Sequence, residues 1–347
     1  MNKLEEKYIE YGGVDPQGID FPKAIYDEPH HVFIQERKKP YFPSHMMVLK
    51  NARVCGVSGT VITRDNNLLS EVSFEFGKKP QNHSIFTYNK LPRISGDLDQ
   101  VALLSFCQPY NYYHWMFDIL PRLYILRESH LDFQRIIINP LRVPFQYETL
   151  HMLGIHDSSL VACHQNLHVK VNQLQIPFLP SYLGYMPKWA CEFLRNELLK
   201  YREERQGYER LYISRESMCR KVANENEVIE FLGRYGFKKI TLENMSVKEQ
   251  ISLFSSAEVV ISPHGAALAN LVFCKPGTKV IELFPGTYIH PHYRVLSYHI
   301  DLNYHYLVGK GVRPMFESGL LFPLAICDHI EIKLEDLFKT LQLANVL

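Results

Sequence analysis

The feature that most constrains the fold is a regular alternation of helical and strand-like segments in the second half of the chain. Strand-like runs lie at 210–214, 237–242, 258–262 and 278–284. Segments with helical periodicity lie before and between them, at 188–206, 226–236, 247–257 and 266–273. This order and spacing indicate βαβ units, and they predict an α/β fold with a parallel sheet covered by helices.

The first half of the chain begins instead with features of antiparallel β structure. Short β-rich runs between residues 46 and 76, with an Asp-Asn-Asn turn at 65–67, predict a meander. After a strand at 101–106, Asn111 is a suitable N-cap for a helix that bends at Pro121. Further strands are predicted at 135–139 and 167–176, and a helix at 145–153.

The length of the chain predicts two domains, because 347 residues exceed what one hydrophobic core usually holds. Residues 177–187 contain three prolines and a glycine, so we place the boundary there. We expect a first lobe over residues 1–180, with an irregular arm at 1–45, and a second lobe over 181–330. The amphipathic helix predicted at 331–347 could pack back on the first lobe.

Charge and composition exclude several classes of protein. The 38 Lys and Arg residues balance 37 Asp and Glu residues, and a net charge of +1 provides no basic surface for nucleic acid. With 46% hydrophobic and 22% charged residues, the chain is globular rather than disordered. The longest stretches without a charged residue, 100–117 and 171–187, contain Asn, Gln or Pro, which disfavours a membrane span.

The N-terminal sequence and the cysteines bear on localisation. The first 13 residues are charged and lack the apolar core of a signal peptide. The seven cysteines are odd in number and form no Cys-x-x-Cys pair, so we interpret them as reduced core thiols. Both features favour a cytoplasmic protein, and peripheral association with a membrane surface stays open.

An anion site is predicted where the parallel strands end, because open parallel sheets bind ligands at the carboxyl ends of their strands. The strand at 258–262 is followed by a Pro-His-Gly turn with His264 and Gly265, and a helix begins near Ala266. Backbone N–H groups and the positive end of a helix dipole then lie at one point, which suits a phosphate.

Basic side chains are predicted beside this turn. Arg215 follows the strand at 210–214, with Arg220 and Lys221 in the same loop. A guanidinium group there could hold a phosphate from the side. The simpler alternative is that Arg215 is a surface residue and His264 a packed turn residue.

Two segments resemble the signature segments of the glycosyltransferase 61 family. They are 111–123 (NYYHWMFDILPRL) and 262–285 (SPHGAALANLVFCKPGTKVIELFP). Between them, 211–228 is similar to that family's arginine-containing strand, loop and helix. The resemblance runs from about residue 50 to 310, and the family includes bacterial capsular-polysaccharide proteins and eukaryotic enzymes that add xylose or N-acetylglucosamine.

The resemblance implies a GT-B architecture, in which two Rossmann-like lobes face a cleft. The second lobe would bind a nucleotide-sugar, most simply a UDP-sugar, and the first lobe a glycan, lipid-linked or protein acceptor. The implied activity is that of an inverting glycosyltransferase of surface polysaccharide biosynthesis. No metal or cofactor is expected, because a helix dipole and basic side chains such as Arg215 would stabilise the departing diphosphate.

Glu282 is a further candidate for donor binding. It lies in the otherwise apolar strand at 278–284, and a buried carboxyl group is costly without hydrogen-bond partners. A contact with a ribose and a structural salt bridge would each explain it.

A candidate catalytic base lies in the first lobe. His114 and Asp118 are four residues apart, so they share one face of the predicted helix. A histidine with a carboxylate neighbour can take a proton from an acceptor hydroxyl at neutral pH. The alternative is that His114 packs or binds the acceptor while Asp118 caps local backbone. Asn111 and Trp115 are expected to shape the helix entry and the acceptor pocket.

Two patterns could suggest a metal, and we discount both. Asp97 and Asp99 form an Asp-x-Asp motif, which we place in a loop before Val101 and interpret as a chance match. A His-rich segment lacks the spacing of a zinc site; it contains His290, His292, His299 and His305.

Within that segment, His290 and His292 are better candidates for donor or acceptor contacts, and Arg294 beside them could reach a phosphate. Two rival functions stay open. One is a metal-dependent hydrolase that uses these histidines, and the other is a non-catalytic module that binds a nucleotide or a glycan. Loss of activity with a chelator would identify the first, and binding without turnover the second.

Overall fold

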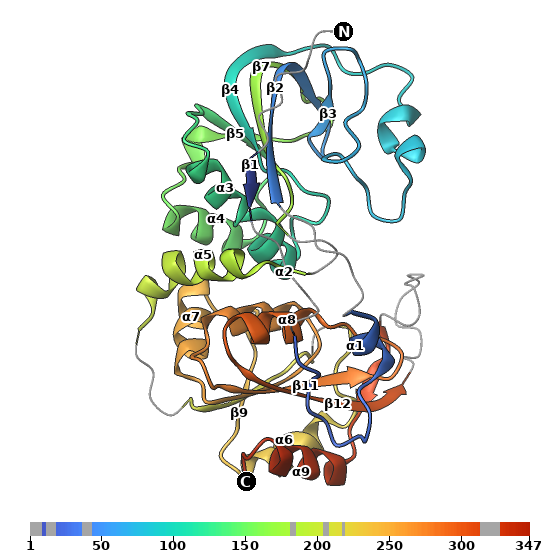
Figure 1. Cartoon of the computed structure of the whole chain (residues 1–347), viewed down its shortest axis with the longest axis vertical. Helices are drawn as coiled ribbons and strands as arrows, with labels where there is room; N and C mark the ends of the chain where they lie inside the picture. Colours follow the sequence, from blue (N-terminus) through green and yellow to red (C-terminus); the bar gives the residue numbers. More distant parts are fainter. Residues whose placement is uncertain are drawn as a thin grey trace. The chain divides into compact units, whose positions relative to one another are not determined.

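The chain divides into two units, and it passes from one to the other more than once. In the computed structural model, unit 1 comprises residues 1–14 and 42–197, and unit 2 comprises 15–41 and 198–347. The ribbon in Figure 1 is coloured along the sequence. The structure describes residues 9–11, 19–36, 44–180, 185–203, 208–216, 219–312 and 327–347.

Unit 1 is built on a mixed seven-stranded sheet with the order β1-β2-β7-β4-β5-β6, in which β3 also pairs with β2. Strand β2 is antiparallel to β1, β3 and β7, whereas β7, β4, β5 and β6 are successively parallel. The strands are β1 (Ile9–Tyr11), β2 (Ser44–Cys55), β3 (Thr60–Ile62), β4 (Gly96–Leu103), β5 (Arg135–Ile138), β6 (Leu160–Ala162) and β7 (His168–Pro177).

Helices cover one side of this sheet, where α3 and α4 lie in Figure 1. The predicted helix after Asn111 is present, but it has three parts: α2, a π-helical turn η4, and α3 after Pro121. The helices of unit 1 are η2 (Pro80–Asn82), η3 (Ser84–Thr87), α2 (Tyr112–His114), η4 (Trp115–Ile119), α3 (Arg122–Glu128), α4 (Pro144–Met152), η5 (Asp157–Ser159) and α5 (Lys188–Leu198).

Two predictions for unit 1 are wrong. Residues 70–76 form turns instead of a third meander strand, because the Val61 N–H group donates to the Ser73 hydroxyl (2.8 Å) rather than to a strand carbonyl. Asp97 and Asp99 lie within strand β4 rather than in a loop, with both side chains exposed.

Unit 2 contains the predicted parallel sheet, with the order β13-β12-β11-β10-β8-β9. Only the short β13 is antiparallel to its neighbour β12, and both of these strands lie outside the predicted alternation. The strands are β8 (Arg210–Ile213), β9 (Lys238–Ile240), β10 (Val259–Pro263), β11 (Lys279–Pro285), β12 (Asn303–Val312) and β13 (His329–Glu331).

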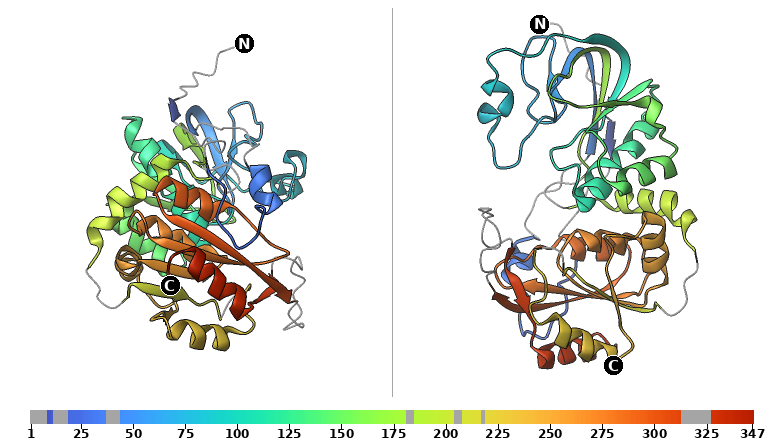
Figure 2. Two further views of the ribbon diagram at one scale, coloured as in Figure 1. Left: turned by 60° about the horizontal axis from the view of Figure 1, so that its bottom comes forward. Right: turned by 180° about the vertical axis from the view of Figure 1, so that it is seen from behind.

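Helices lie on both faces of this sheet, with α7 and α8 on one side and α6 and α9 on the other (Figures 1 and 2). The segment after Gly265 is a 3-10 helix, η7, and α8 occupies the His-rich segment. The helices of unit 2 are α1 (His31–Glu36), η6 (Leu199–Tyr201), α6 (Glu225–Gly233), α7 (Val247–Ser256), η7 (Ala266–Phe273), α8 (His292–His299) and α9 (Leu334–Leu343).

The C-terminal helix α9 packs within unit 2, because Leu337 and Leu341 belong to the same hydrophobic core as Ile261 and Ile281 of the sheet. The sequence left open that this helix packs on the first lobe, and that part of the prediction is wrong. An amphipathic pattern shows that one face of a helix is buried, but it does not show which part of the protein buries it.

The described part of the N-terminal arm also contributes to unit 2. Residue Lys23 forms a parallel bridge with His305 of β12, and the Phe33 ring packs on Tyr306 with 4.9 Å between ring centroids. Residues 19–36 are therefore a structural part of the second unit rather than an irregular arm of the first.

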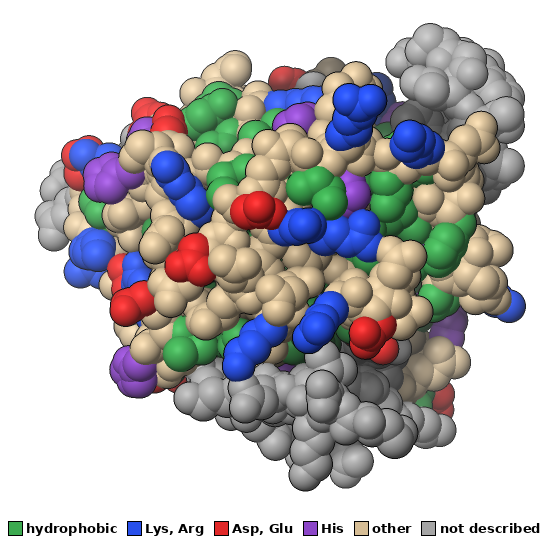
Figure 3. Space-filling model, turned by 90° about the horizontal axis from the view of Figure 1, so that it is seen from above, with side chains coloured by type: hydrophobic (Ala, Val, Ile, Leu, Met, Phe, Trp, Pro, Cys, Tyr) green, Lys and Arg blue, Asp and Glu red, His purple; other side chains and the backbone are tan. Residues whose placement is uncertain are grey.

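The surface shows no concentration of one charge on the face drawn in Figure 3, where Lys and Arg side chains lie among Asp and Glu. Within the residues that the structure describes, no helix has both the length and the apolar character needed to cross a bilayer.

Candidate functional site

In unit 1, His114 and Asp118 are in direct contact. The distance between His114 Nδ1 and Asp118 Oδ2 is 2.6 Å. The Asn111 side chain fixes the start of this helical segment by accepting hydrogen bonds from the N–H groups of Tyr113 and His114. The π-helical turn that follows is a rare conformation that often occurs at functional sites. The sequence prediction that His114 and Asp118 share a helix face is confirmed.

The contact determines which nitrogen of His114 is available for chemistry. An ionised carboxylate only accepts hydrogen bonds, so Nδ1 carries the proton toward Asp118, and Nε2 keeps its lone pair. The His114 side chain is 26% exposed, whereas that of Asp118 is 4% exposed. The imidazole also packs against Phe76 and Phe106, with centroid distances of 5.8 and 5.5 Å. The His114 ring is therefore held in place by Asp118 and two aromatic rings, and part of it stays exposed.

Arg122 is a functional candidate that the sequence analysis missed. Its buried guanidinium donates hydrogen bonds to the carbonyl groups of Pro177 (2.8 Å), Ser105 (3.1 Å) and Leu103 (2.6 Å). Burial lowers the pKa of Arg122 to about 9, although the charge of Asp118 acts in the opposite direction. Its place four residues after Asp118 in an apolar helix was a signal that could have identified it.

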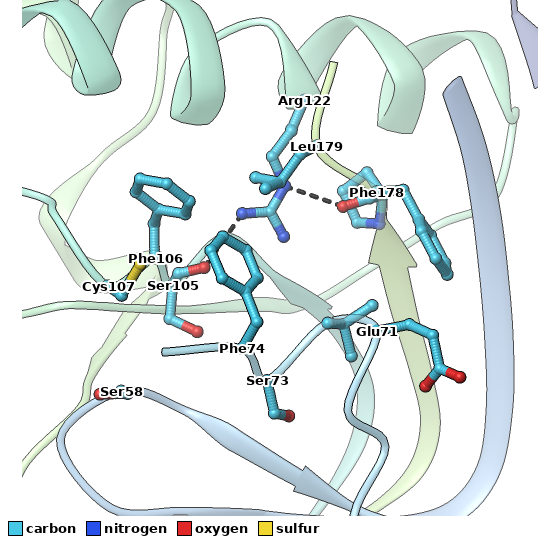
Figure 4. Close-up of a pocket in the computed structure, with 12 residues that line it drawn as sticks. Ser58, Glu71, Ser73, Phe74, Ser105, Phe106, Cys107, Arg122, Phe178 and Leu179 are labelled. Atoms are coloured by element: carbon cyan, nitrogen blue, oxygen red, sulfur yellow. Dashed lines mark hydrogen bonds between the residues drawn. The ribbon is translucent and has the colours of Figure 1, made fainter. Parts of the chain in front are cut away.

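Arg122 also lines a small pocket in unit 1, which is drawn in Figure 4. Phe106, which packs on His114, forms part of the same wall, so the pocket lies next to the candidate base. The lining combines aromatic faces with hydroxyl groups and one carboxylate; the residues are Ser58, Glu71, Val72, Ser73, Phe74, Ser105, Phe106, Cys107, Arg122, Pro177, Phe178 and Leu179.

Trp115 has no exposed surface, and its indole Nε1 donates a hydrogen bond to the Thr149 hydroxyl (2.8 Å). The side chain therefore anchors the π-helical turn against α4. Asn111 shapes the helix entry as expected, through its capping hydrogen bonds.

In unit 2, His264 and Glu282 form a buried pair. The distance between His264 Nδ1 and Glu282 Oε1 is 2.5 Å, and the Tyr304 hydroxyl donates to the other carboxyl oxygen (2.5 Å). Burial raises the pKa of Glu282 well above its usual range, and burial with the charges of Arg220 and Arg215 lowers the pKa of His264. Burial therefore favours the uncharged form of each group.

Of the two explanations given for Glu282, the structural one fits the geometry, because the side chain is fully buried and bonded at both oxygens. Because burial favours the uncharged forms, this contact fits a hydrogen bond between a carboxylic acid and His264 better than the salt bridge that was one of the two alternatives. The pair holds the His264 ring in place at the end of β10.

We expect Glu282→Ala to lower the free energy of unfolding by about 2 kcal/mol, because it leaves buried polar groups of His264 and Tyr304 without their partner. Glu282→Gln should stay within about 1 kcal/mol of the parent, because a neutral amide can donate to His264 and accept from Tyr304. Urea unfolding measures both values. An equally large loss in Glu282→Gln would show that a charged carboxylate is needed.

Arg215 lies directly against the backbone of Gly265. A Cβ atom placed on Gly265 would lie 1.7 Å from Arg215 Nη1 and 2.3 Å from its Cζ, so a residue with a side chain cannot coexist with this position of the guanidinium. The guanidinium donates hydrogen bonds to the carbonyl oxygen of Cys219, at 3.3 and 3.1 Å. Burial and then the charge of Arg220 lower the pKa of Arg215 to about 10. The prediction that Arg215 lies beside the turn at His264 and Gly265 agrees with this geometry.

Arg220 lies beside the same turn. Its Nε donates to the His264 carbonyl (3.2 Å), and its guanidinium carbon lies 4.8 Å from the Tyr288 ring centroid. The backbone φ of Arg220 is 61°, in the left-handed region that is uncommon for residues other than glycine. Lys221 instead takes part in the backbone pairing with β13, where its carbonyl accepts from the Ile330 N–H group (2.9 Å).

The rings of His290 and His292 lie near His264. The centroid distances are 5.9 Å from His264 to His290, 5.2 Å from His290 to His292, and 4.4 Å from Tyr288 to His290. Over the described ranges of the chain, no group of three or more His, Cys, Asp or Glu residues is arranged to hold a metal ion. The Tyr288 ring, which contacts His290, also lies against the Arg220 guanidinium.

Arg294 has a different role from the one suggested by its position in the sequence. Its buried guanidinium donates to the backbone carbonyl groups of Ile19 and Asp20, at 2.8 Å for each of two contacts. It fastens the N-terminal segment to unit 2.

The arrangement in unit 2 suits a ligand with adjacent anionic oxygens. Arg215 and Arg220 lie near the carboxyl ends of β8 and β10, and η7 begins at Ala266 beside them. Burial lowers the pKa of His264, so the attraction for an anion comes from the two guanidinium groups. The arrangement in unit 1 suits removal of a proton.

Comparisons with known proteins match both regions. The glycosyltransferase 61 family pattern matches residues 112–281, which include His114, Asp118, Arg215, Arg220 and His264. A beta-1,2-xylosyltransferase of Oryza sativa subsp. japonica is 30% identical over 193 residues, or 50% of this chain and 35% of the relative. The EGF domain-specific O-linked N-acetylglucosamine transferase of Drosophila melanogaster is 27% identical over 97 residues, or 27% of this chain and 19% of the relative.

A protein O-linked-mannose beta-1,4-N-acetylglucosaminyltransferase 2 of Xenopus laevis is 39% identical over 72 residues, which cover 20% of this chain and 12% of the relative. The matched regions thus span about a third or less of the length of these curated relatives. The family resemblance inferred from the two sequence segments is confirmed.

Proposed function

We propose that this chain, a member of the glycosyltransferase 61 family, transfers a sugar from a nucleotide-sugar to a hydroxyl group of a glycan or glycoconjugate. The observation that carries the proposal is the pair of guanidinium groups at the strand ends of unit 2, within the same family region as the His114–Asp118 pair. The relatives support sugar transfer, since they are named as a xylosyltransferase and N-acetylglucosaminyltransferases.

In the proposed reaction, the acceptor hydroxyl oxygen attacks the anomeric carbon of the donor from the side opposite the diphosphate. The bond between that carbon and the diphosphate oxygen breaks, and its electron pair stays on the diphosphate. His114 Nε2 takes the hydroxyl proton, and the Asp118 carboxylate stabilises the imidazolium that forms. This single displacement inverts the anomeric configuration.

Arg215 and Arg220 are proposed to stabilise the charge that develops on the leaving diphosphate. Preorganised cationic donors can do this without a metal ion, because they are already oriented when the charge develops. The hydrogen bonds of both arginines to backbone carbonyl groups orient them before the donor binds.

The pocket beside His114 is the proposed acceptor site. Sugars have apolar C–H faces and polar rims, and this lining offers the aromatic faces of Phe74 and Phe106 together with hydroxyl groups and Glu71. The buried Arg122 charge at its edge also lies near the candidate base.

Finer assignments are proposals that rest on the family resemblance. They are a UDP-sugar as donor, surface polysaccharide or a lipid-linked or protein glycan as acceptor, a GT-B arrangement of two lobes, and a cytoplasmic location, with contact at a membrane surface open. A decisive test is release of UDP from candidate UDP-sugars by the purified chain with and without acceptor. Donor binding without turnover for any acceptor would favour a binding module.

We expect turnover to survive EDTA, because the proposed stabilisation of the diphosphate uses Arg215 and Arg220 and no metal site is arranged among the described residues. Asp99→Asn should be nearly silent, since Asp99 is exposed and its carboxylate accepts a hydrogen bond from Asn172 (3.2 Å). Initial rates with and without chelator measure this. An absolute requirement for Mn²⁺ or Mg²⁺ would overturn the arginine-based account.

A further inference from the structure

Three of the seven cysteines are not buried, contrary to the sequence-based interpretation, and two of these three are in contact. Four of the seven are buried, as expected for core thiols: Cys55, Cys163, Cys191 and Cys274. Cys219 is exposed and Cys327 is partly exposed, and their sulfur atoms are only 2.8 Å apart although 108 residues separate them. They therefore form an accessible pair of thiols that sequence spacing could not reveal.

This contact belongs to a longer register between two segments. Val222 forms a parallel bridge with Ile330, and the Asn224 side chain bonds both backbone groups of Ile332. In each of these two pairs the partners are 108 residues apart in sequence, which is also the separation of Cys219 and Cys327. The backbone hydrogen bonds Ile330 N–H to Lys221 and Ala223 N–H to Ile330 fix the alignment. The sulfur atoms are thus brought together by backbone pairing and not by a chance contact of flexible side chains.

The pair lies at the proposed arginine site. The carbonyl of Cys219 accepts both hydrogen bonds from Arg215, and Arg220 is the next residue in the chain. A covalent bond at Cys219 would therefore restrain the backbone carbonyl that accepts both hydrogen bonds from Arg215.

We propose that Cys219 and Cys327 are a redox-modifiable dithiol, which a disulfide-type oxidant converts into an intramolecular disulfide that links Cys219, next to Arg220, to Cys327, two residues before β13. The Cys219 thiolate attacks one sulfur of the oxidant, glutathione disulfide for example, and displaces one glutathione thiolate. The Cys327 thiolate then attacks Cys219 of the mixed disulfide and displaces the second. Two electrons pass to the oxidant, and the two thiol protons end on the two glutathione molecules.

The order of attack follows from exposure. Cys219 is the more accessible sulfur, whereas burial and the neighbouring Cys219 raise the pKa of Cys327 to about 11. The second step therefore depends on a small thiolate fraction at neutral pH, and closure of the disulfide should become faster as the pH rises from 7 to 9.

The test treats the full-length reduced protein with glutathione disulfide and maps cysteines by mass spectrometry without reduction. We expect a peptide pair that joins Cys219 to Cys327, and a rise in Tm of about 5 °C or more, because the bond closes a long loop. Cys107→Ser should keep both results, since the Cys107 thiol is partly buried and burial raises its pKa to about 12. Cys219→Ser and Cys327→Ser should each abolish both.

Three outcomes would overturn the proposal. They are glutathione adducts at Cys219 without cross-linking, an absence of reaction at both residues in the folded protein, or a cross-linked protein whose Tm is unchanged. None of these readouts depends on glycosyl transfer, so the proposed function and this inference can fail separately.

Discussion

His114→Ala is expected to lower kcat on the order of 10²–10⁴-fold, because it removes the group that takes the proton from the acceptor hydroxyl. Asp118→Asn should lower kcat over a similar range, since the carboxylate orients Nδ1–H and stabilises the imidazolium. Affinity for the nucleotide-sugar should change little in either variant, because the proposed donor contacts lie in unit 2. Steady-state kinetics and calorimetry with UDP-sugar separate the two quantities.

A matched control is available in the same unit. His151 and Asp157 form a second histidine–carboxylate contact of 3.2 Å, but both side chains are mostly exposed and lie outside the proposed site. His151→Ala should therefore leave kcat unchanged. Added imidazole should restore part of the activity of His114→Ala if the missing function is proton transfer. Near-normal kcat in both His114→Ala and Asp118→Asn, with native donor affinity, would remove this pair from the mechanism.

Gly265→Ala is expected to weaken binding of UDP or the UDP-sugar by about ten- to hundredfold, as is Arg215→Ala. A charge-assisted hydrogen bond contributes about 1.5–3 kcal/mol, and either change removes the guanidinium from its position. The two variants differ in charge, because Gly265→Ala keeps the arginine and only displaces the far end of its flexible side chain. Isothermal calorimetry measures the affinities, and circular dichroism confirms that the variants are folded.

Gly286→Ala is the control for the effect of a methyl group. A Cβ there would meet its nearest neighbour, Val308, at 3.8 Å, which is an ordinary contact. This variant should bind the donor as the parent does. If Gly265→Ala and Arg215→Ala both keep native affinity while folded, the turn at His264 is not the donor site. Loss in Arg215→Ala alone would mean that charge matters and the position of the guanidinium does not.

The elements that could be predicted from the sequence were those whose own residues carry a clear pattern of strand, helix or turn. The parallel sheet of unit 2 was predictable because each βαβ unit has its own local pattern of strand, helix and turn. Strands β12 and β13 were missed although both pair with nearby segments, because β12 contains His305, Lys310 and two glycines among its apolar residues and β13 has only three residues. Residues 70–76 carry a strand-like pattern, but a single hydroxyl contact from Ser73 replaces the ladder. Local propensity could not reveal that competition.

For the candidate site, the four-residue spacing within one helix was sufficient to predict that His114 lies beside Asp118. The order of strands along one sheet was sufficient to predict that Arg215 lies near Gly265. The partners of buried polar groups were not predictable. Tyr304 reaches Glu282 from a neighbouring strand, and Arg294 bonds carbonyl groups more than 270 residues away. The sequence could show that such groups need partners, but only the fold shows which ones they have.

The place of residues 19–36 in unit 2 has a consequence for biosynthesis. Tyr26 bonds Val308 across 282 residues, so at 5–20 residues per second the ribosome needs roughly 15–60 s to supply the later partner. During that interval the Phe33 ring, which is fully buried in the folded protein, lacks its contact with Tyr306, and the Ile19 carbonyl lacks its hydrogen bond from Arg294. Unit 1 can meanwhile fold on the ribosome. We therefore expect the early segment to be the part of the nascent chain that chaperones hold longest.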